Sequence, residues 1–205
     1  MSVSRTLVSV ARRALWAMHR PRLPVNEHGA VYVHLGCGSV AHPRFINVDA
    51  RPAPHVHHVC GIDKLSCFQT GLADLIYVSH ALEHFSHLKT VDVLTEWRRV
   101  LKAGGILRLS VPDFDRLLTI YHAAGNDVDA IAGILMGQQD YALNFHFAVF
   151  TRTSLTRRLL AVGFREVREW TPNSDELTTF GDYSSYQIQI AGAWYPVSLN
   201  LEAVK

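Results

Sequence analysis

The chain has 205 residues, of which 48% are hydrophobic and 19% charged, and this length and composition predict one globular domain with a sizeable core. The formal net charge of +2 does not indicate nucleic-acid binding, and no run of 18 apolar residues predicts a membrane span. The three cysteines lack the spacing of a disulfide framework, and the N-terminus lacks a secretory signal, so we expect a cytoplasmic protein.

The first segment has helical periodicity and a basic character. Apolar residues fall on one face of residues 5–19, and the charged residues among them are arginines. Such a helix can rest peripherally on an anionic membrane surface or dock on a partner; the alternative is a helix that covers the cofactor side or simply caps the sheet. Two prolines then end the segment. We therefore divide the chain into an N-terminal basic amphipathic helix and linker, residues 1–27, and a main domain, residues 28–205.

The next stretch, residues 31–50, predicts strand, glycine turn, second strand and acid. Apolar residues lead into Gly36 and Gly38, and a second apolar run ends at Asp49. Ligands of a doubly wound sheet bind outside the carboxyl ends of the strands, where a carboxylate can accept hydrogen bonds from both hydroxyls of a ribose. A dinucleotide fingerprint is not matched, because position 41 is alanine and Asp49 follows too soon. A P-loop is excluded, since no Gly-Lys-Ser/Thr follows.

The middle of the chain predicts further strands and helices. Residues 55–60 alternate like a strand rich in histidine, which is either a metal site or a solvated edge strand. A buried strand at residues 72–78 is followed by the sequence His80-Ala-Leu-Glu-His84. A helix is predicted for residues 88–101, with Gly104 and Gly105 as its C-terminal stop, and a strand for residues 106–111.

The spacing H-x-x-E-H at residues 80–84 is also a zinc signature of hydrolases. In that interpretation His80 and His84 bind zinc and Glu83 is the general base. A strand that runs directly into His80 disfavours it, because the helix that should carry both ligands has barely begun there. Glu83 and His84 have the alternative of structural roles at a helix start.

The last third predicts an inserted segment and then the end of the sheet. Asp113 is either a substrate-side residue or the N-cap of a helix at residues 114–122. Amides, aromatics and histidine gather in residues 114–150, which suits a pocket for a polar acceptor. A helix at residues 154–162, capped by Thr151 or Thr153, precedes a strand at residues 164–170. Residues 188–190 and 197–204 predict a final hairpin.

Four motifs in the expected order resemble the class I S-adenosylmethionine-dependent methyltransferases. They are His34-Leu-Gly-Cys-Gly-Ser39 with Asp49, Asp74-Leu-Ile-Tyr-Val-Ser-His-Ala-Leu-Glu-His-Phe85, Glu96-Trp-Arg-Arg-Val-Leu-Lys-Ala-Gly-Gly105, and Leu107-Arg-Leu-Ser-Val-Pro-Asp113. The end of the chain resembles a bacterial subfamily associated with surface-polysaccharide genes. The resemblance spans roughly residues 30–205 and implies an α/β fold with a doubly wound, mostly parallel seven-stranded sheet, Rossmann-like, with an antiparallel closing strand.

The resemblance also implies roles for particular residues. S-adenosylmethionine is the expected cofactor, and no metal is expected. An acid that often contacts the adenine is replaced by Gly61, so either the backbone near Gly61 and Ile62 or the carboxylate of Asp63 takes that task. The residues implied for the cofactor are His34, Gly36, Cys37, Gly38, Asp49, Gly61, Ile62, Ser79 and His80.

Residues 114–150 correspond to an acceptor lid in the family. The base that removes an acceptor proton is expected among His146, His84 and Asp113, in that order; the alternative for His146 is a polar residue packed under the lid. The implied function is methylation of a small-molecule or glycan acceptor, with oxygen the expected acceptor atom. Two alternatives are a zinc hydrolase using residues 80–84 and a catalytically silent member of the fold that binds a partner.

Overall fold

The computed structural model describes Trp16 and residues 21–205. The predicted basic helix at residues 5–19 therefore lies outside the described residues, apart from Trp16, whose indole N–H donates to the carbonyl of Val56 at 2.6 Å. No helix in the described part of the chain is long and apolar enough to cross a membrane.

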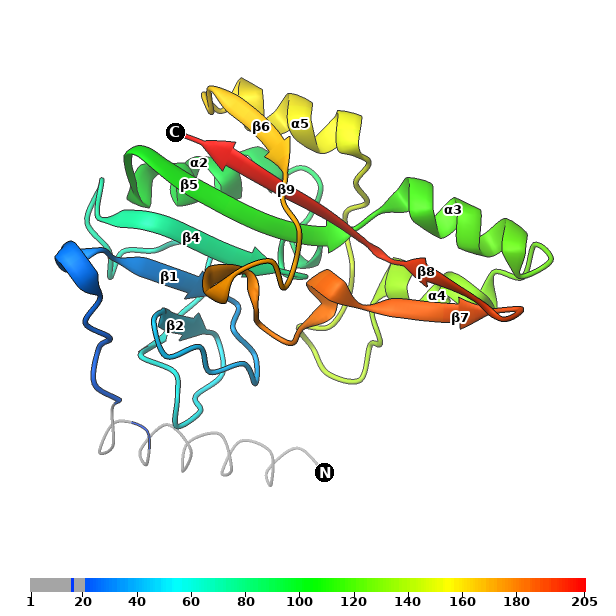
Figure 1. The fold of residues 1–205 in the computed structure, drawn as a ribbon, viewed down its shortest axis with the longest axis horizontal. Coiled ribbons are helices and arrows are strands. Elements are labelled where there is room, and N and C mark those ends of the chain that lie inside the picture. Colours follow the sequence, from blue (N-terminus) through cyan, green and yellow to red (C-terminus); the bar gives the residue numbers. More distant parts are fainter. Residues whose placement is uncertain (1–15, 17–20) are drawn as a thin grey trace.

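The centre of the molecule is a seven-stranded sheet in the order β3-β2-β1-β4-β5-β9-β6 (Figure 1). Its first five strands in this order run parallel, and β9 is antiparallel to both β5 and β6. This arrangement confirms the predicted mostly parallel sheet with its antiparallel closing strand. The strands are β1 (Tyr32–Leu35), β2 (Ile46–Asp49), β3 (His58–Val59), β4 (Ala73–Ser79), β5 (Leu101–Pro112), β6 (Glu166–Glu169) and β9 (Ser198–Val204).

Two helices cover one face of this sheet. They are α2 (Thr90–Val100) and α5 (Arg152–Ala161). In α2, Val93, Leu94, Trp97 and Val100 recur at helical spacing, and all are buried against the main core. Burial of the Trp97 indole needs a partner for its N–H, which donates to the carbonyl of Ile62 at 2.7 Å. This contact ties the loop after β3 to the helix layer and so places one wall of the site.

An irregular segment, residues 171–185, lies against the opposite face over β4. It contains the 3₁₀ helices η3 (Glu176–Thr178) and η4 (Tyr183–Ser185). The ring of Phe180 stacks on that of Tyr77 with centroids 3.6 Å apart and planes 4° apart, and both rings are buried. The segment therefore has its own apolar contact with the sheet, and its C-terminal half reaches the carboxyl ends of the strands.

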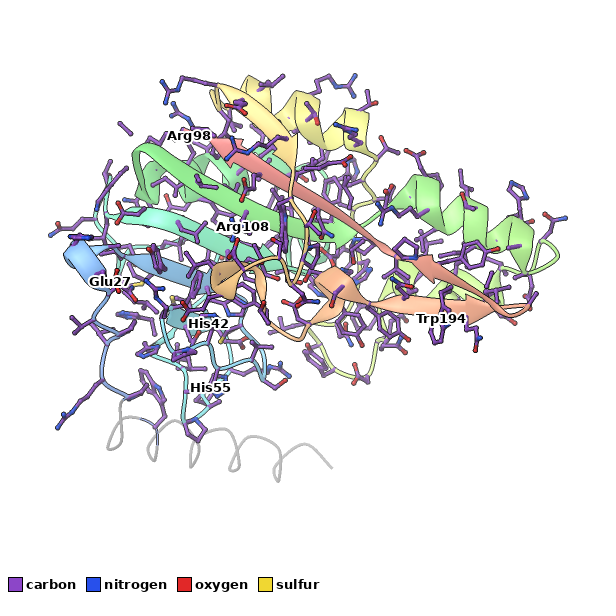
Figure 2. The ribbon with its side chains drawn as sticks, viewed as in Figure 1. Glu27, His42, His55, Arg98, Arg108 and Trp194 are labelled. Carbon is purple, nitrogen blue, oxygen red and sulfur yellow. The ribbon has the colours of Figure 1, made fainter. Side chains whose placement is uncertain are left out.

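A second lobe stands beyond the carboxyl end of β5 (Figure 1). It consists of α3 (Phe114–Ala123), α4 (Asp129–Met136) and the hairpin of β7 (Gln187–Ile190) and β8 (Ala193–Pro196). A small apolar cluster holds these elements together, and Trp194 projects from the hairpin with 62% of its surface exposed (Figure 2). The remaining short helices are η1 (Glu27–Gly29) and η2 (Leu82–His84).

Three predicted elements need correction. Helix α2 ends at Val100, before the two glycines, because Leu101 already pairs with Ala73 in the sheet. Gly104, with φ of +78°, instead shapes a bulge inside β5. Residues 187–190 pair with residues 193–196 in a separate hairpin, and β9 joins the main sheet. The strand expected at residues 55–60 contracts to His58–Val59, at the edge of the sheet.

Candidate functional site

A cavity of about 630 Å³ opens at the carboxyl ends of the parallel strands. Every residue proposed from the sequence for the cofactor lines it, and so do His84 and His146. The segment after β3, Ala81, His84 and Phe85 around η2, the end of α4 with the loop that follows it, and residues 181–183 complete its wall. The carboxyl ends of the strands and the second lobe therefore face one common space.

The glycine turn after β1 forms the inner wall of one half of the cavity. Gly36 and Gly38 have φ of +66° and +56°, a region that favours glycine. A Cβ at Gly36 would lie 3.1 Å from the Cβ of Ala81, whereas one at Gly38 would meet no atom within 4 Å. The N–H of Cys37 donates to the carbonyl of Val48 at 3.1 Å, which fixes the turn against β2. The short crossing between β1 and β2 thus needs no helix.

Asp49 lies at the end of β2 with 7% of its surface exposed. One carboxylate oxygen accepts from the N–H of Gly38 at 2.9 Å, and the other accepts from the N–H of Arg51 at 2.8 Å. Each oxygen has a second lone pair, so the carboxylate can still accept from the two hydroxyls of a ribose. The turn and the acid therefore fit the nucleoside end of S-adenosylmethionine.

The neighbouring wall includes Gly61, Ile62 and Asp63. The Asp63 carboxylate is folded over Gly61, where an added Cβ would lie 2.7 Å from its Oδ1. Glycine at position 61 thus gives Asp63 the space to reach the cavity. Both interpretations from the sequence, an adenine contact from the backbone at 61–62 or from Asp63, remain predictions.

His34 and Cys37 have buried side chains. Burial lowers the pKa of His34 to about 3, so its imidazole is neutral among the rings of Phe45, Tyr77 and Phe180. Burial also raises the pKa of the Cys37 thiol to about 12, which leaves it protonated and a poor nucleophile. Both side chains shape the wall of the cavity and offer it no charge.

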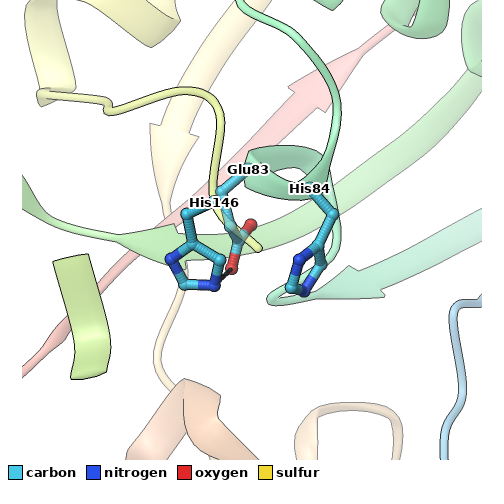
Figure 3. Close-up of side chains that lie close together, drawn as sticks. All are labelled: Glu83, His84 and His146. Carbon is cyan, nitrogen blue, oxygen red and sulfur yellow. Dashed lines mark ion pairs between the residues drawn. The ribbon is translucent and has the colours of Figure 1, made fainter. Parts of the chain in front are cut away.

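A cluster of Glu83, His84 and His146, whose side chains point toward one another, lies at the other half of the cavity (Figure 3). The two histidines line the cavity, and Glu83 is buried beside them. Glu83 and His84 come from η2, and His146 comes from the loop after α4. Backbone hydrogen bonds hold that loop in place, since the N–H of Phe147 donates to the carbonyl of Glu83 at 2.8 Å. The sequence alone could not show that His146 meets two residues that lie 62 and 63 positions before it.

Both imidazoles of the cluster bond to a backbone carbonyl through Nδ1. For His84 the partner is the carbonyl of Phe145 at 3.1 Å, and for His146 it is the carbonyl of Ile134 at 2.9 Å. A carbonyl only accepts, so each Nδ1 carries the hydrogen and each Nε2 keeps a free lone pair. Burial is the main cause that lowers the pKa of both imidazoles, to about 4 for His146. Both rings are therefore neutral acceptors at pH 7.

Glu83 is fully buried, and neither carboxylate oxygen has a hydrogen-bond partner within the described part of the chain. Its Oε1 lies 3.9 Å from Nε2 of His146 and 3.4 Å from Nδ1 of His80. Burial raises the pKa of Glu83 to about 8. A buried acid without a hydrogen-bond partner, beside two histidines that line the cavity, is costly to keep, which marks it as a functional candidate.

His80 does not take part as the zinc signature requires. Its backbone has φ of +48°, and its Nε2 donates at 2.7 Å to Ser198, whose hydroxyl donates in turn to the carbonyl of Tyr183 at 2.7 Å. The strand runs directly into His80, and η2 is a single 3₁₀ turn. The arrangement of a metal hydrolase with His80 and His84 as ligands is therefore not favoured.

Asp113 is the predicted site residue that does not line the cavity. Its carboxylate caps α3 by accepting from the N–H of Asp115 at 3.1 Å and pairs with Arg116 at 3.2 Å. The N-cap interpretation is confirmed, and the candidates for the base reduce to His84 and His146. Asp182 and Tyr183 line the cavity without having been singled out from the sequence; the polar run that contains them was the only signal.

The fold is that of the Rossmann-like methyltransferases, and solved structures of this class superpose on it. A methyltransferase of Archaeoglobus fulgidus has a TM-score of 0.53 at 16% identity, over 98% of this chain and 94% of that one. A Thermotoga maritima methyltransferase has a TM-score of 0.54 at 15% identity, over 96% and 89%. The 1,6-didemethyltoxoflavin-N1-methyltransferase of Burkholderia thailandensis was solved with bound 1,6-didemethyltoxoflavin and S-adenosylhomocysteine. It has a TM-score of 0.52 at 15% identity, over 96% of this chain and 76% of that one.

Residues 41–109 match the family model described as a methyltransferase domain. No curated protein matches the chain. The matched residues include Asp49, the segment at 61–63 and the H-x-x-E-H stretch, so they cover part of the cavity wall, whereas the glycine turn and His146 lie outside the match. The family match and the fold together support an S-adenosylmethionine-dependent methyltransferase, with S-adenosylmethionine as its cofactor.

Proposed function

We propose that the protein methylates a hydroxyl oxygen of a small-molecule or glycan acceptor. The observation that carries this proposal is the cavity that the two halves share: the glycine turn and Asp49 line one half, and His84 and His146, beside Glu83, line the other. A nucleoside held at Asp49 and an acceptor held at the histidines would share one cavity, which brings the two together and aligns them.

When bound, S-adenosylmethionine supplies an activated methyl group with a good leaving group. The chain must then position the acceptor and take its proton. A hydroxyl loses a proton as it is methylated, and a neutral imidazole with a free lone pair can accept it. His146 and His84 both meet that requirement through the carbonyls that fix their Nδ1–H. A neutral amine nitrogen is nucleophilic enough to attack before it loses its proton, whereas a hydroxyl needs a base, which is why oxygen is favoured here.

The residues that the loop after α4 contributes to the cavity favour an organic acceptor of modest size. Gln138, Tyr141 and Asn144, from the loop after α4, line the cavity beside His146. Amides and a phenol supply hydrogen bonds and an aromatic face to a polar molecule. The Burkholderia enzyme of the same fold holds a small molecule. The glycan acceptor, the cytoplasmic location and the peripheral membrane contact through residues 5–19 rest on the sequence and belong to the proposal.

The first test is thermal unfolding of the purified chain with and without S-adenosylhomocysteine. At a hundredfold excess over Kd, one native-state site adds about 2.7 kcal/mol, which for a chain of this size raises Tm by roughly 5–10 °C. The second test incubates the protein with S-adenosylmethionine and matched pairs of hydroxylated and amino acceptors, and detects methylation by mass. Absence of the thermal shift, or methylation of the amino members alone, would overturn the proposal.

A further inference from the structure

Glu83, His84 and His146 are also the set of side chains that a transition-metal ion prefers. Each offers a ligand atom, and these atoms all lie within 4.8 Å of one another. Among the residues that the structure describes, they form the one such group of three or more histidine, cysteine or acidic side chains. Two imidazoles and one carboxylate are a recurrent ligand set for zinc and other first-row divalent ions.

The hydrogen bonds around the cluster already hold both rings as a metal requires. Metal-binding histidines donate their other ring N–H to a carbonyl or carboxylate, which fixes the tautomer and the orientation. His84 and His146 do this through Phe145 and Ile134, at 3.1 and 2.9 Å. The nitrogen left free on each ring is Nε2, and the Nε2 of His146 faces Glu83 at 3.9 Å.

Glu83 gives an independent reason to expect a cation. It is 0% exposed, and both of its oxygens lack a hydrogen-bond partner in the described part of the chain. Leaving a buried carboxylate without hydrogen-bond partners is unfavourable, and a cation bound by one of its oxygens would neutralise its charge. The distances require only a small closure, since ligands of a tetrahedral zinc ion lie about 3.4 Å apart.

We infer that Glu83, His84 and His146 bind one divalent transition-metal ion, of which Zn²⁺ is the representative, in the wall of the cavity. Three protein ligands leave a coordination position free, and His84 and His146 open onto the cavity, so that position can take an oxygen of the acceptor. Metal binding itself rests on the geometry; only the acceptor contact rests on the proposed function. When bound, the ion would act as a Lewis acid that lowers the pKa of the acceptor hydroxyl, whose proton would pass to solvent; in the metal-free chain His146 or His84 would take it.

The experiment is a titration of the full chain, freed of metal by a chelator, with Co²⁺ followed by visible absorption and with Zn²⁺ followed by calorimetry. We expect one equivalent of either ion and the intense absorption of four- or five-coordinate Co²⁺. His84→Ala and His146→Ala should each weaken the affinity at least tenfold, and so should Glu83→Gln, which keeps the shape of the side chain. His87→Ala is the matched control, because His87 is exposed and does not line the cavity.

Binding of S-adenosylhomocysteine, measured in the same samples, separates the outcomes. A variant that binds the nucleotide with wild-type affinity is folded, so its loss of metal is a loss of ligands. A wild-type chain that binds the nucleotide but neither ion would overturn the metal site and leave the methyltransferase proposal standing. Unchanged metal affinity in both His84→Ala and His146→Ala would also overturn it, since the ion would then lie elsewhere.

Discussion

The carboxylate of Asp49, at the end of β2, accepts a hydrogen bond of 2.9 Å from the backbone N–H of Gly38, in the turn that follows β1. One side chain thus fixes the glycine turn and presents its remaining lone pairs to the cavity. Its second oxygen accepts from the N–H of Arg51 at 2.8 Å, which fixes the carboxylate in turn. Cofactor affinity and the local backbone therefore depend on the same group.

Replacement of Asp49 by alanine should weaken the binding of S-adenosylhomocysteine about ten- to a hundredfold, since hydrogen bonds to a charged acceptor contribute about 1.5–3 kcal/mol. The affinity of Asp49→Asn should fall between those of the wild type and Asp49→Ala, because the amide keeps one acceptor oxygen. Calorimetric titration measures both. Asp92→Asn, an exposed acid in the first turn of α2, serves as the control. Wild-type affinity in Asp49→Ala would remove Asp49 from the cofactor site.

The aromatic contact between Phe180 and Tyr77 yields a prediction about stability. Phe180 is 7% exposed and stacks on Tyr77 at 3.6 Å. Phe180→Ala should lower the free energy of unfolding by about 3–5 kcal/mol, because it leaves a cavity between residues 171–185 and the sheet. Urea unfolding followed by circular dichroism measures it. Val128→Ala, at a side chain 56% exposed, should change little; an equal loss in both variants would contradict the role of the stack.

Local patterns in the sequence were sufficient to predict which residues lie at the carboxyl ends of β1 and β2. The apolar run before Gly36 and the acid at Asp49 lie within one strand-turn-strand unit, so their positions follow from short-range rules. The same is true of Thr151, whose hydroxyl caps α5 as one of the two predicted caps. Asp113 could be either a cap or a site residue, and the choice depended on whether its side chain reached the cavity.

Contacts between distant segments could not be predicted in this way. Glu83 and His146 meet because the loop after α4 pairs its backbone with η2, and no periodicity encodes that. The predicted pairing of residues 188–190 with residues 197–204 was wrong for a local reason, since β7 pairs with β8 in a hairpin. Its two-residue turn is Ala191-Gly192, with φ of +49° and +85°, and alanine rarely adopts that conformation, so the turn signal was weak.

A buried ion network in the sheet gives a third prediction. Glu202 on β9 is 5% exposed. In the strand register it lies opposite Arg108 of β5 and Arg168 of β6, and it forms an ion pair with each (Arg108 is labelled in Figure 2). Glu202→Ala leaves the mostly buried Arg108 guanidinium without a counter-ion, with the carbonyl of Leu177 as its remaining acceptor, so the free energy of unfolding should fall by about 3–5 kcal/mol.

Arg168→Ala should cost less, about 1 kcal/mol or below, because the Arg168 side chain is 49% exposed. Urea unfolding of the two variants side by side tests the difference. The double variant Arg108→Met with Glu202→Leu should recover much of the stability, since it removes both buried charges together. A larger loss in Arg168→Ala than in Glu202→Ala would show that the buried arginine is not what makes the network costly to break.

The last prediction concerns the pH dependence of stability. Glu96 on α2 bonds to Arg99 at 2.7 Å and accepts from the N–H of Leu65 at 2.7 Å. The hydrogen bond from Arg99 is the main cause that lowers the pKa of this carboxyl below its usual value. A lowered pKa in the folded state means that the stabilisation is complete above about pH 4.3, the usual value of glutamate, and is lost as the pH falls through the folded pKa.

Glu96→Gln should therefore be less stable than the wild type at pH 7, and the difference between the two should shrink as the pH is lowered toward 3. Urea midpoints at pH 7, 4 and 3 measure it, with Asp92→Asn on the same helix as the control. The glutamine can still accept from the N–H of Leu65, so the variant removes the charge and keeps the neutral hydrogen bond. A difference that stays constant across this pH range would show that the ion pair with Arg99 contributes nothing measurable.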